Sequence, residues 1–124
     1  MAGKKLNPEH QQLLQAADKA RRDQEVADQY QGAIETLAEK VPDDPVVADQ
    51  LPKCRAFRRL LHEFRQSLAP MVAAIENRDP VPEDFNPSKA QRLLPEWEAA
   101  RTVFLQDYRA HVDYLEKLAL RLVR

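Results

Sequence analysis

The sequence predicts an all-α protein, an elongated antiparallel bundle of three long helices with short extra helical turns at proline breaks. Charged residues make up 31% of the 124 residues and Gly occurs only twice, a composition typical of helical proteins. Apolar residues recur at intervals of three and four, and Asx-Pro pairs mark helix starts. The length suits one domain. We expect a single helical-bundle domain over 1–124, with helices at about 8–41, 52–77 and 87–123 and linkers at 42–51 and 78–86.

Asn or Asp is followed by Pro at 7–8, 44–45 and 86–87. At each pair the Asn or Asp side chain can accept hydrogen bonds from the first free N–H groups of a helix, and Pro suits the first helical position because it has no N–H. Two proline-rich, acidic stretches lie between these starts, "VPDDP" at 41–45 and "DPVPEDFNP" at 79–87. They predict the breaks between the helices.

The first segment carries a thin apolar stripe that is interrupted by the polar run "RRDQE" at 21–25. Asp23 falls at a position that the helical register would bury. Either the helix loosens there, or Asp23 meets a cation from a neighbouring helix, since a buried carboxylate needs a partner. The stripe consists of Leu13, Ala16, Ala20, Ala27, Tyr30, Ile34, Leu37 and Val41.

The second segment has the strongest apolar pattern, a heptad seam with large residues. Pro52 is expected to begin this helix after a short turn formed by "PVVADQ" at 45–50. Pro70 predicts a kink or a restart at Ala69-Pro70, because proline removes one backbone hydrogen bond and clashes with the preceding turn. The seam consists of Cys54, Phe57, Leu61, Phe64, Leu68, Met71 and Ile75.

In the third segment, Pro95 is expected to separate a short turn, "PSKAQRLL" at 87–94, from a long helix that begins at Pro95. The apolar stripe of this helix continues to the C-terminal end. Leu120 and Val123 lie outside the stripe, so the last turns are apolar over much of their circumference. We therefore expect a homo-oligomer that associates through Leu120 and Val123. The alternatives are a frayed end or a different protein that covers it.

A positively charged face lies to one side of the second helix. Its members fall in a sector of about 120° away from the seam, and only Glu63 interrupts them. This basic face is the candidate interaction surface, for a protein partner or for the phosphates of a nucleic acid. The alternative is a solvated face that Asp and Glu from the first or third helix neutralise. The basic face consists of Arg55, Arg58, Arg59, His62 and Arg65.

Cys54 is the single cysteine, so an intramolecular disulfide is excluded. We expect a buried structural thiol, because Cys54 lies in the seam; the alternative is a reactive thiol whose pKa Lys53 and Arg55 lower. The first residues, "MAGKKLNPEH", lack the apolar core of a signal peptide, and no apolar run approaches the ~20 residues that span a membrane. We expect a cytoplasmic protein that does not bind membranes.

The histidines give no sign of a metal site. His10, His62 and His111 lie in three different segments, and none is three or four residues from another His or from Cys54. Asp107 and His111 are one turn apart, but a di-metal bundle needs Glu-x-x-His on two helices. We expect His111 to pair with the Asp107 carboxylate, and we expect no metal.

Other catalytic and cofactor chemistries find little support. Gly3 and Gly32 are isolated, which excludes a phosphate-binding loop of the P-loop or dinucleotide type, so we expect no cofactor. Arg55 and His62 have roughly the spacing of an Arg and His pair used by some helical ribonucleases. In a chain with so many arginines such a pair is expected by chance, and we do not expect an enzyme.

The formal net charge is −1, so no overall field attracts nucleic acid. We expect a noncatalytic helical interaction module, such as an adaptor, a chaperone-like subunit or a small assembly component, that binds a protein partner. The alternative is an accessory nucleic-acid-binding subunit that uses the basic face. Phe57 and Phe64 lie on the seam and are not free to stack on bases, which favours the protein partner.

Overall fold

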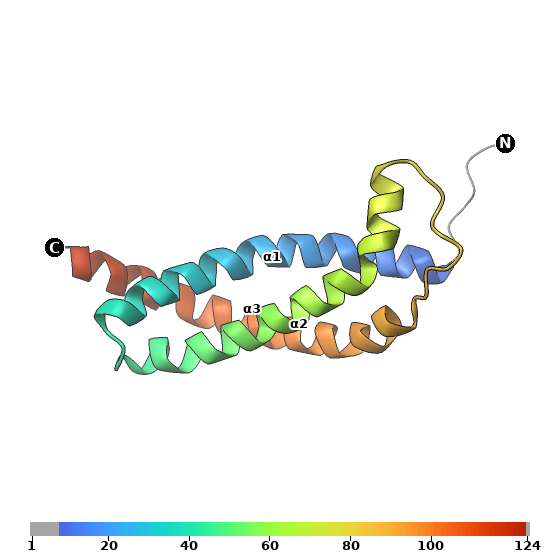
Figure 1. The fold of residues 1–124 in the computed structure, drawn as a ribbon. Helices are drawn as coiled ribbons and strands as arrows, with labels where there is room; N and C mark the ends of the chain where they lie inside the picture. Colours follow the sequence, from blue (N-terminus) through green and yellow to red (C-terminus); the bar gives the residue numbers. More distant parts are fainter. Residues whose placement is uncertain (1–7, 124) are drawn as a thin grey trace.

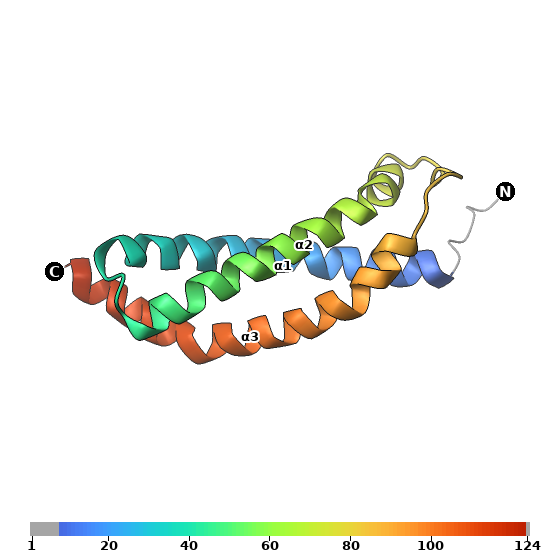
Figure 2. The same cartoon turned by 60° about the horizontal axis from the view of Figure 1, so that its bottom comes forward.

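The computed structural model describes residues 8–123 and consists of three helices, α1 (Pro8–Lys40), α2 (Pro45–Glu76) and α3 (Ser88–Val123). Consecutive helices run in opposite directions along an elongated molecule (Figures 1 and 2). The described residues contain no strand. The predicted all-α bundle of three long helices is confirmed.

The start of α2 differs from the prediction. The helix begins at Pro45 and not at Pro52, so most of the predicted linker at 42–51 is helical. Oδ1 of Asp44 accepts hydrogen bonds from the backbone N–H groups of Val46 (3.0 Å) and Val47 (3.1 Å), which caps the first turn. Pro52 is the eighth residue of α2, beyond the first turn, so it removes the backbone hydrogen bond to the carbonyl oxygen of Ala48, and the helix continues across it. The Asx-Pro pair at 44–45 was therefore the correct start signal.

Pro70 bends α2 without ending it. The helix is continuous across Pro70, so the expected alternative of a restart is wrong, but its last turns turn sharply away from the axis of the preceding part (Figure 1). The missing N–H and the bulk of the proline ring account for this kink. α3 is likewise continuous across Pro95, and its first turns lie at an angle to the rest (Figure 2). The extra turns predicted at prolines therefore belong to the long helices.

Stacked aromatic rings join α2 to α3 in the core. Phe57 stacks on Phe104 with ring centroids 4.3 Å apart, and Phe64 stacks on Trp97 at 4.8 Å. All members of the predicted seam of α2 are buried except Ile75, which is partly buried. These contacts confirm that the seam faces the other helices.

α1 stays continuous through its polar centre because Asp23 has a partner on another helix. Asp23 is 3% exposed, and Nε of Arg101, on α3, donates a hydrogen bond to its Oδ2 over 2.7 Å. Burial raises the pKa of the Asp23 carboxyl, and the hydrogen bond from Arg101 acts in the opposite direction. The expected cation from a neighbouring helix is confirmed, and the alternative of a loosened helix is wrong.

α2 ends in a Schellman motif. The backbone N–H of Arg78 bonds to the carbonyl oxygen of Ile75, and that of Asp79 bonds to the carbonyl oxygen of Ala74. Arg78 adopts φ = 59°, in the left-handed region that usually takes Gly at this position. The motif stops α2 at Glu76 and directs the chain into the connection that leads to α3.

Candidate functional site

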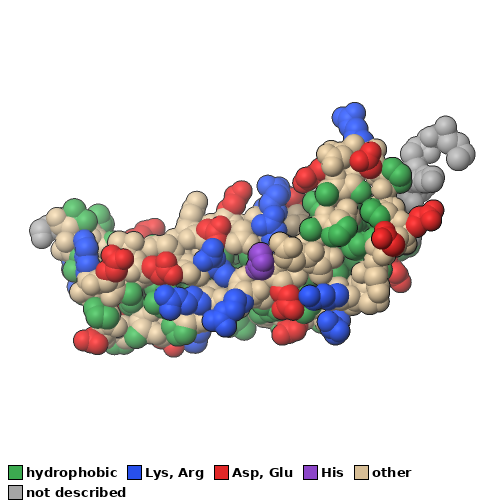
Figure 3. Space-filling view, viewed as in Figure 1, with side chains coloured by type: hydrophobic (Ala, Val, Ile, Leu, Met, Phe, Trp, Pro, Cys, Tyr) green, Lys and Arg blue, Asp and Glu red, His purple; other side chains and the backbone are tan. Residues whose placement is uncertain are grey.

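A groove of about 680 Å³ lies between α1 and the end of α2. It runs along residues 14–24 of α1 and 62–76 of α2, so its α2 wall includes the bend at Pro70. Hydrophobic side chains gather at this end of the molecule (Figure 3). Its floor is apolar and consists of Leu14, Ala17, Leu68, Ala69, Val72, Ala73 and Ile75.

The rim of the groove carries charge of both signs. His62 and Arg65 lie toward Gln24, because α1 and α2 are antiparallel, and Glu76 lies close enough to Arg21 for their charges to interact. The remaining rim side chains are Asp18, Arg21 and Gln66. The groove therefore combines an apolar floor with a rim that carries charge of both signs.

Arg21 and Asp18 occupy the α1 side of the rim. Nη2 of Arg21 lies 3.0 Å from Oδ1 of Asp18, and Nη2 of Arg22 lies 2.9 Å from its Oδ2. The hydrogen bond from Arg21 lowers the pKa of the Asp18 carboxyl. Asp18 therefore pairs with two arginines, whereas Arg65, on the α2 side of the rim, has no ion-pair partner within residues 8–123.

The structure divides the predicted basic face into two parts. Arg58 Nη2 lies 2.7 Å from Oδ1 of Asp28, and Arg55 Nη2 lies 3.6 Å from Oε1 of Glu35. Both carboxylates are on α1, so the expected neutralisation by a neighbouring helix applies to these two arginines. Acidic side chains are accordingly mixed with Lys and Arg along the middle of this face (Figure 3).

The other three members of the basic face behave differently. Arg59, His62 and Arg65 are exposed, and His62 and Arg65 form part of the rim of the groove. Within residues 8–123, neither Arg59 nor Arg65 has an ion-pair partner. The basic face is therefore not one continuous site, and its C-terminal part belongs to the groove.

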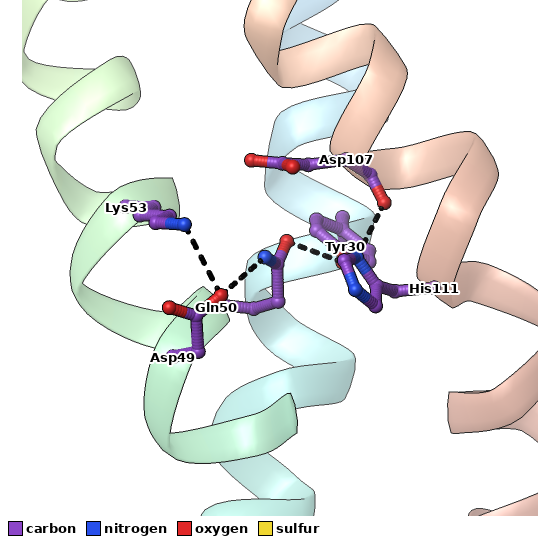
Figure 4. A network of polar contacts seen from close by, with 6 residues as sticks. All are labelled: Tyr30, Asp49, Gln50, Lys53, Asp107 and His111. Carbon is purple, nitrogen blue, oxygen red and sulfur yellow. Dashed lines mark hydrogen bonds and ion pairs between the residues drawn. The ribbon is translucent and has the colours of Figure 1, made fainter. Parts of the chain in front are cut away.

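A second hollow, of about 500 Å³, lies between α2 and α3 and is lined mainly by apolar side chains. Four of its lining residues, Tyr30, Gln50, Lys53 and Asp107, belong to the network of polar contacts in Figure 4. The hydroxyl of Tyr30 donates to Oε1 of Gln50 over 2.9 Å, Nε2 of Gln50 donates to Oδ2 of Asp49 over 3.0 Å, and Lys53 pairs with the same carboxylate at 3.2 Å. These polar groups satisfy one another and join α1 to α2, so the network stabilises the bundle.

Cys54 lies in the core and not on the surface. Its side chain is 2% exposed, and Sγ lies 3.9 Å from the carbonyl oxygen of Ala27. Burial raises the pKa of the Cys54 thiol to about 11, which disfavours the reactive thiolate. The expectation of a buried thiol is confirmed, and the alternative of a thiol activated by Lys53 and Arg55 is wrong.

His111 does not pair as expected. Its Nδ1 lies 2.9 Å from the backbone carbonyl oxygen of Asp107, not from the carboxylate, because the carbonyl one turn earlier in the helix is within reach of the ring. In the part of the chain that the structure describes, no three His, Cys, Asp or Glu side chains gather in a way that could hold a metal ion.

The C-terminal turns of α3 expose apolar surface. Leu120 is 67% exposed and Val123 is 80% exposed, as the sequence indicated from their position outside the stripe. These turns extend beyond the connection between α1 and α2 (Figure 1).

None of the described helices is apolar over a stretch long enough to cross a membrane.

The chain matches no protein-family model, no curated protein and no solved structure. Its function is therefore inferred from the geometry of the described residues. That geometry offers one feature which the sequence did not reveal, the groove beside Pro70. Pro70 indicated a bend in the second helix. A proline in the sequence does not show in which direction the helix bends or which helix lies beside the bend.

Proposed function

We propose that the chain is a noncatalytic helical interaction module that binds an amphipathic helix of a protein partner in the groove between α1 and α2. Such a module would serve as an adaptor, a chaperone-like subunit or a small assembly component in the cytoplasm. The observation that carries the proposal is the combination, in one groove, of an apolar floor with a rim that carries charge of both signs. Amphipathic helices bind in grooves of this kind through one apolar face.

The length of the groove suits three to four turns of a partner helix. At 1.5 Å per residue, the lining extends about 15 Å along α1 and about 21 Å along α2. Ala17, Ala69 and Ala73 leave space for a partner side chain to approach the two backbones closely. A helix with apolar residues at i, i+4 and i+7 would fill this space.

The second candidate function is phosphate binding by the basic face. Arg59 and Arg65 favour it, since both are exposed and neither has an ion-pair partner within residues 8–123. Phe57 and Phe64 weigh against binding of single strands, because both rings are buried and cannot stack on bases. Binding of a protein helix is therefore the better supported function.

Affinity purification from the native host, with nuclease treatment and mass spectrometry, tests the preferred function. The bait with wild-type sequence is compared with an Ala69→Glu, Ala73→Glu variant, which places two carboxylates in the groove at exposed positions. An Ala33→Glu, Ala110→Glu variant is the matched control, because these alanines are also exposed and helical but lie outside the groove. We expect nuclease-resistant capture by the wild type and the control, and its loss in the groove variant.

Equal capture by all three baits would show that the groove is not the binding site. Capture that disappears after nuclease treatment would support the second function instead. In that case a short duplex should bind at low salt. A plot of the logarithm of the binding constant against the logarithm of the salt concentration should then have a slope of about −1 for each phosphate contact. An Arg59→Glu, Arg65→Glu variant should then no longer bind the duplex.

A further inference from the structure

The end of α3 has the chemical character that the groove would accept. Leu120 and Val123 are the most exposed large hydrophobic side chains in the part of the chain that the structure describes. Glu116 lies one turn before Leu120 on the same side of the helix, since positions i, i+4 and i+7 share a face. Glu116 is exposed and has no ion-pair partner among the described residues. This exposed side of α3 therefore presents one carboxylate followed by two apolar side chains.

The α2 side of the groove carries the complementary pattern at the same spacing. Arg65, Ala69 and Val72 stand at i, i+4 and i+7 across the bend at Pro70, and all three line the groove. On α2 the cation Arg65 is therefore followed by two apolar residues of the groove floor, Ala69 and Val72. Arg65 also lacks an ion-pair partner within residues 8–123. A helix parallel to this part of α2 would therefore bring Glu116 to Arg65 when its two apolar residues reach the floor.

We propose that the partner helix is the C-terminal end of α3 from a second copy of this chain. The proposal rests on the proposed function and names the occupant of the same groove. Glu116 of one copy pairs with Arg65 of the other, and Leu120 and Val123 pack on Ala69, Val72 and Ala73. Two exposed apolar side chains and two unpaired charges are thereby covered in one contact.

The arrangement of the helices allows two such contacts at once. Within one copy, α3 runs antiparallel to α2, and the end of α3 lies at the opposite end of the molecule from the groove (Figures 1 and 2). A twofold axis perpendicular to the long axis of the molecule reverses α3, so that α3 of each copy runs parallel to α2 of the other. This is the direction that the match between Glu116 and Arg65 requires. The two copies would form a closed symmetric dimer.

Exchange of the two charges tests the contact. Arg65→Glu and Glu116→Arg each place like charges together, whereas the variant with both changes restores an opposite pair. Both side chains are exposed, so neither change disturbs the core. Light scattering coupled to size exclusion gives the mass over a range of concentrations. We expect twice the 14.3 kDa of one chain for the wild type, a dimer dissociation constant raised about tenfold or more by each single change, and recovery in the double variant.

The apolar part of the contact is tested by Leu120→Glu, Val123→Glu and by Ala69→Glu, Ala73→Glu, both of which should give the mass of one chain. The Ala33→Glu, Ala110→Glu control should remain dimeric. A wild-type mass of one chain at high micromolar concentration would overturn the proposal, and so would a dimer that tolerates both charge changes. A monomeric wild type that still captures another protein through the groove would refute self-docking and leave the proposed function standing.

Discussion

Nε of Arg101 lies 2.7 Å from Oδ2 of Asp23 and links α3 to the buried centre of α1. Replacement of Arg101 by Ala leaves a buried carboxylate without its hydrogen-bond donor. We expect the free energy of unfolding, measured in urea at neutral pH, to fall by about 1–3 kcal/mol. Arg109→Ala is the control, because this exposed arginine of α3 has no ion-pair partner in the described residues, and its effect should stay within about 0.5 kcal/mol. Equal effects of the two changes would contradict a stabilising pair.

The same variant has an expected pH dependence. Burial raises the pKa of Asp23 in the folded state, so between the unfolded and the folded pKa the folded chain binds more protons than the unfolded chain. The contribution of Asp23 to stability therefore falls as the pH rises through this window. Loss of Arg101 raises the pKa of Asp23 further. The difference in stability between wild type and Arg101→Ala should accordingly shrink toward acid pH, where the carboxyl is protonated, and a constant difference would argue against the pair.

Phe64 is fully buried and stacks on Trp97. Phe64→Ala removes this stack and leaves a cavity at the centre of the bundle. The expected loss is about 3–5 kcal/mol in the free energy of unfolding. Val103→Ala serves as the control, because Val103 is 56% exposed and leaves no cavity. A thermal melt of Phe64→Ala that matches the wild type would remove Phe64 from the core and contradict the register of α2.

Arg78 closes the Schellman motif in a backbone conformation that Gly adopts without strain. Arg78→Gly should therefore raise the free energy of unfolding by about 0.5–1 kcal/mol, after allowance for the greater freedom of Gly in the unfolded chain. Asn77→Gly is a useful comparison, since Asn77 has φ = −86° and gains nothing from Gly. Destabilisation of the Arg78 variant would mean that this residue makes a favourable contact which outweighs the backbone strain.

The Cys54 thiol should be unreactive while the chain is folded. With its pKa raised to about 11, little thiolate exists at pH 8, and the sulfur is covered. A chromogenic disulfide reagent should react at least about tenfold faster with the chain unfolded in urea than with the native chain. Above pH 9.0, the unfolded chain loses this proton before the folded chain does, so the contribution of Cys54 to stability falls as the pH rises toward 11. Rapid native labelling would contradict the burial of Cys54.

The fold was largely predictable because its determinants are local. The spacing of the seam in α2 and the Asx-Pro pairs fixed which residues face the core and where the helices start. The errors arose at Pro52 and Pro95, which were expected to begin helices. Each is the eighth residue of its helix and removes one backbone hydrogen bond, but the turns before it bury side chains in the core, including Val47 in α2 and Leu93 in α3, so these turns remain helical.

The candidate site was much less predictable because it depends on relations between helices. The sequence indicated that Arg58 and Arg65 share a face, but only the position of α1 shows that Arg58 meets Asp28 while Arg65 does not meet a carboxylate. Likewise, Asp23 and Arg101 are far apart in sequence, and their contact follows from the packing of α1 on α3. The groove itself exists because Pro70 bends α2 beside α1.

Labelling of a thiol placed in the groove tests most directly whether the groove binds a helix. The Ala73→Cys variant has an accessible thiol in the groove, and the Ala33→Cys variant has one on the outside of α1, while Cys54 is buried in both. The ratio of the two labelling rates is measured in dilute purified protein and again in nuclease-treated extract of the native host. Occupation of the groove predicts that labelling at position 73 slows at least about tenfold relative to position 33 in the extract, because bound side chains cover the floor. An unchanged ratio would contradict the account.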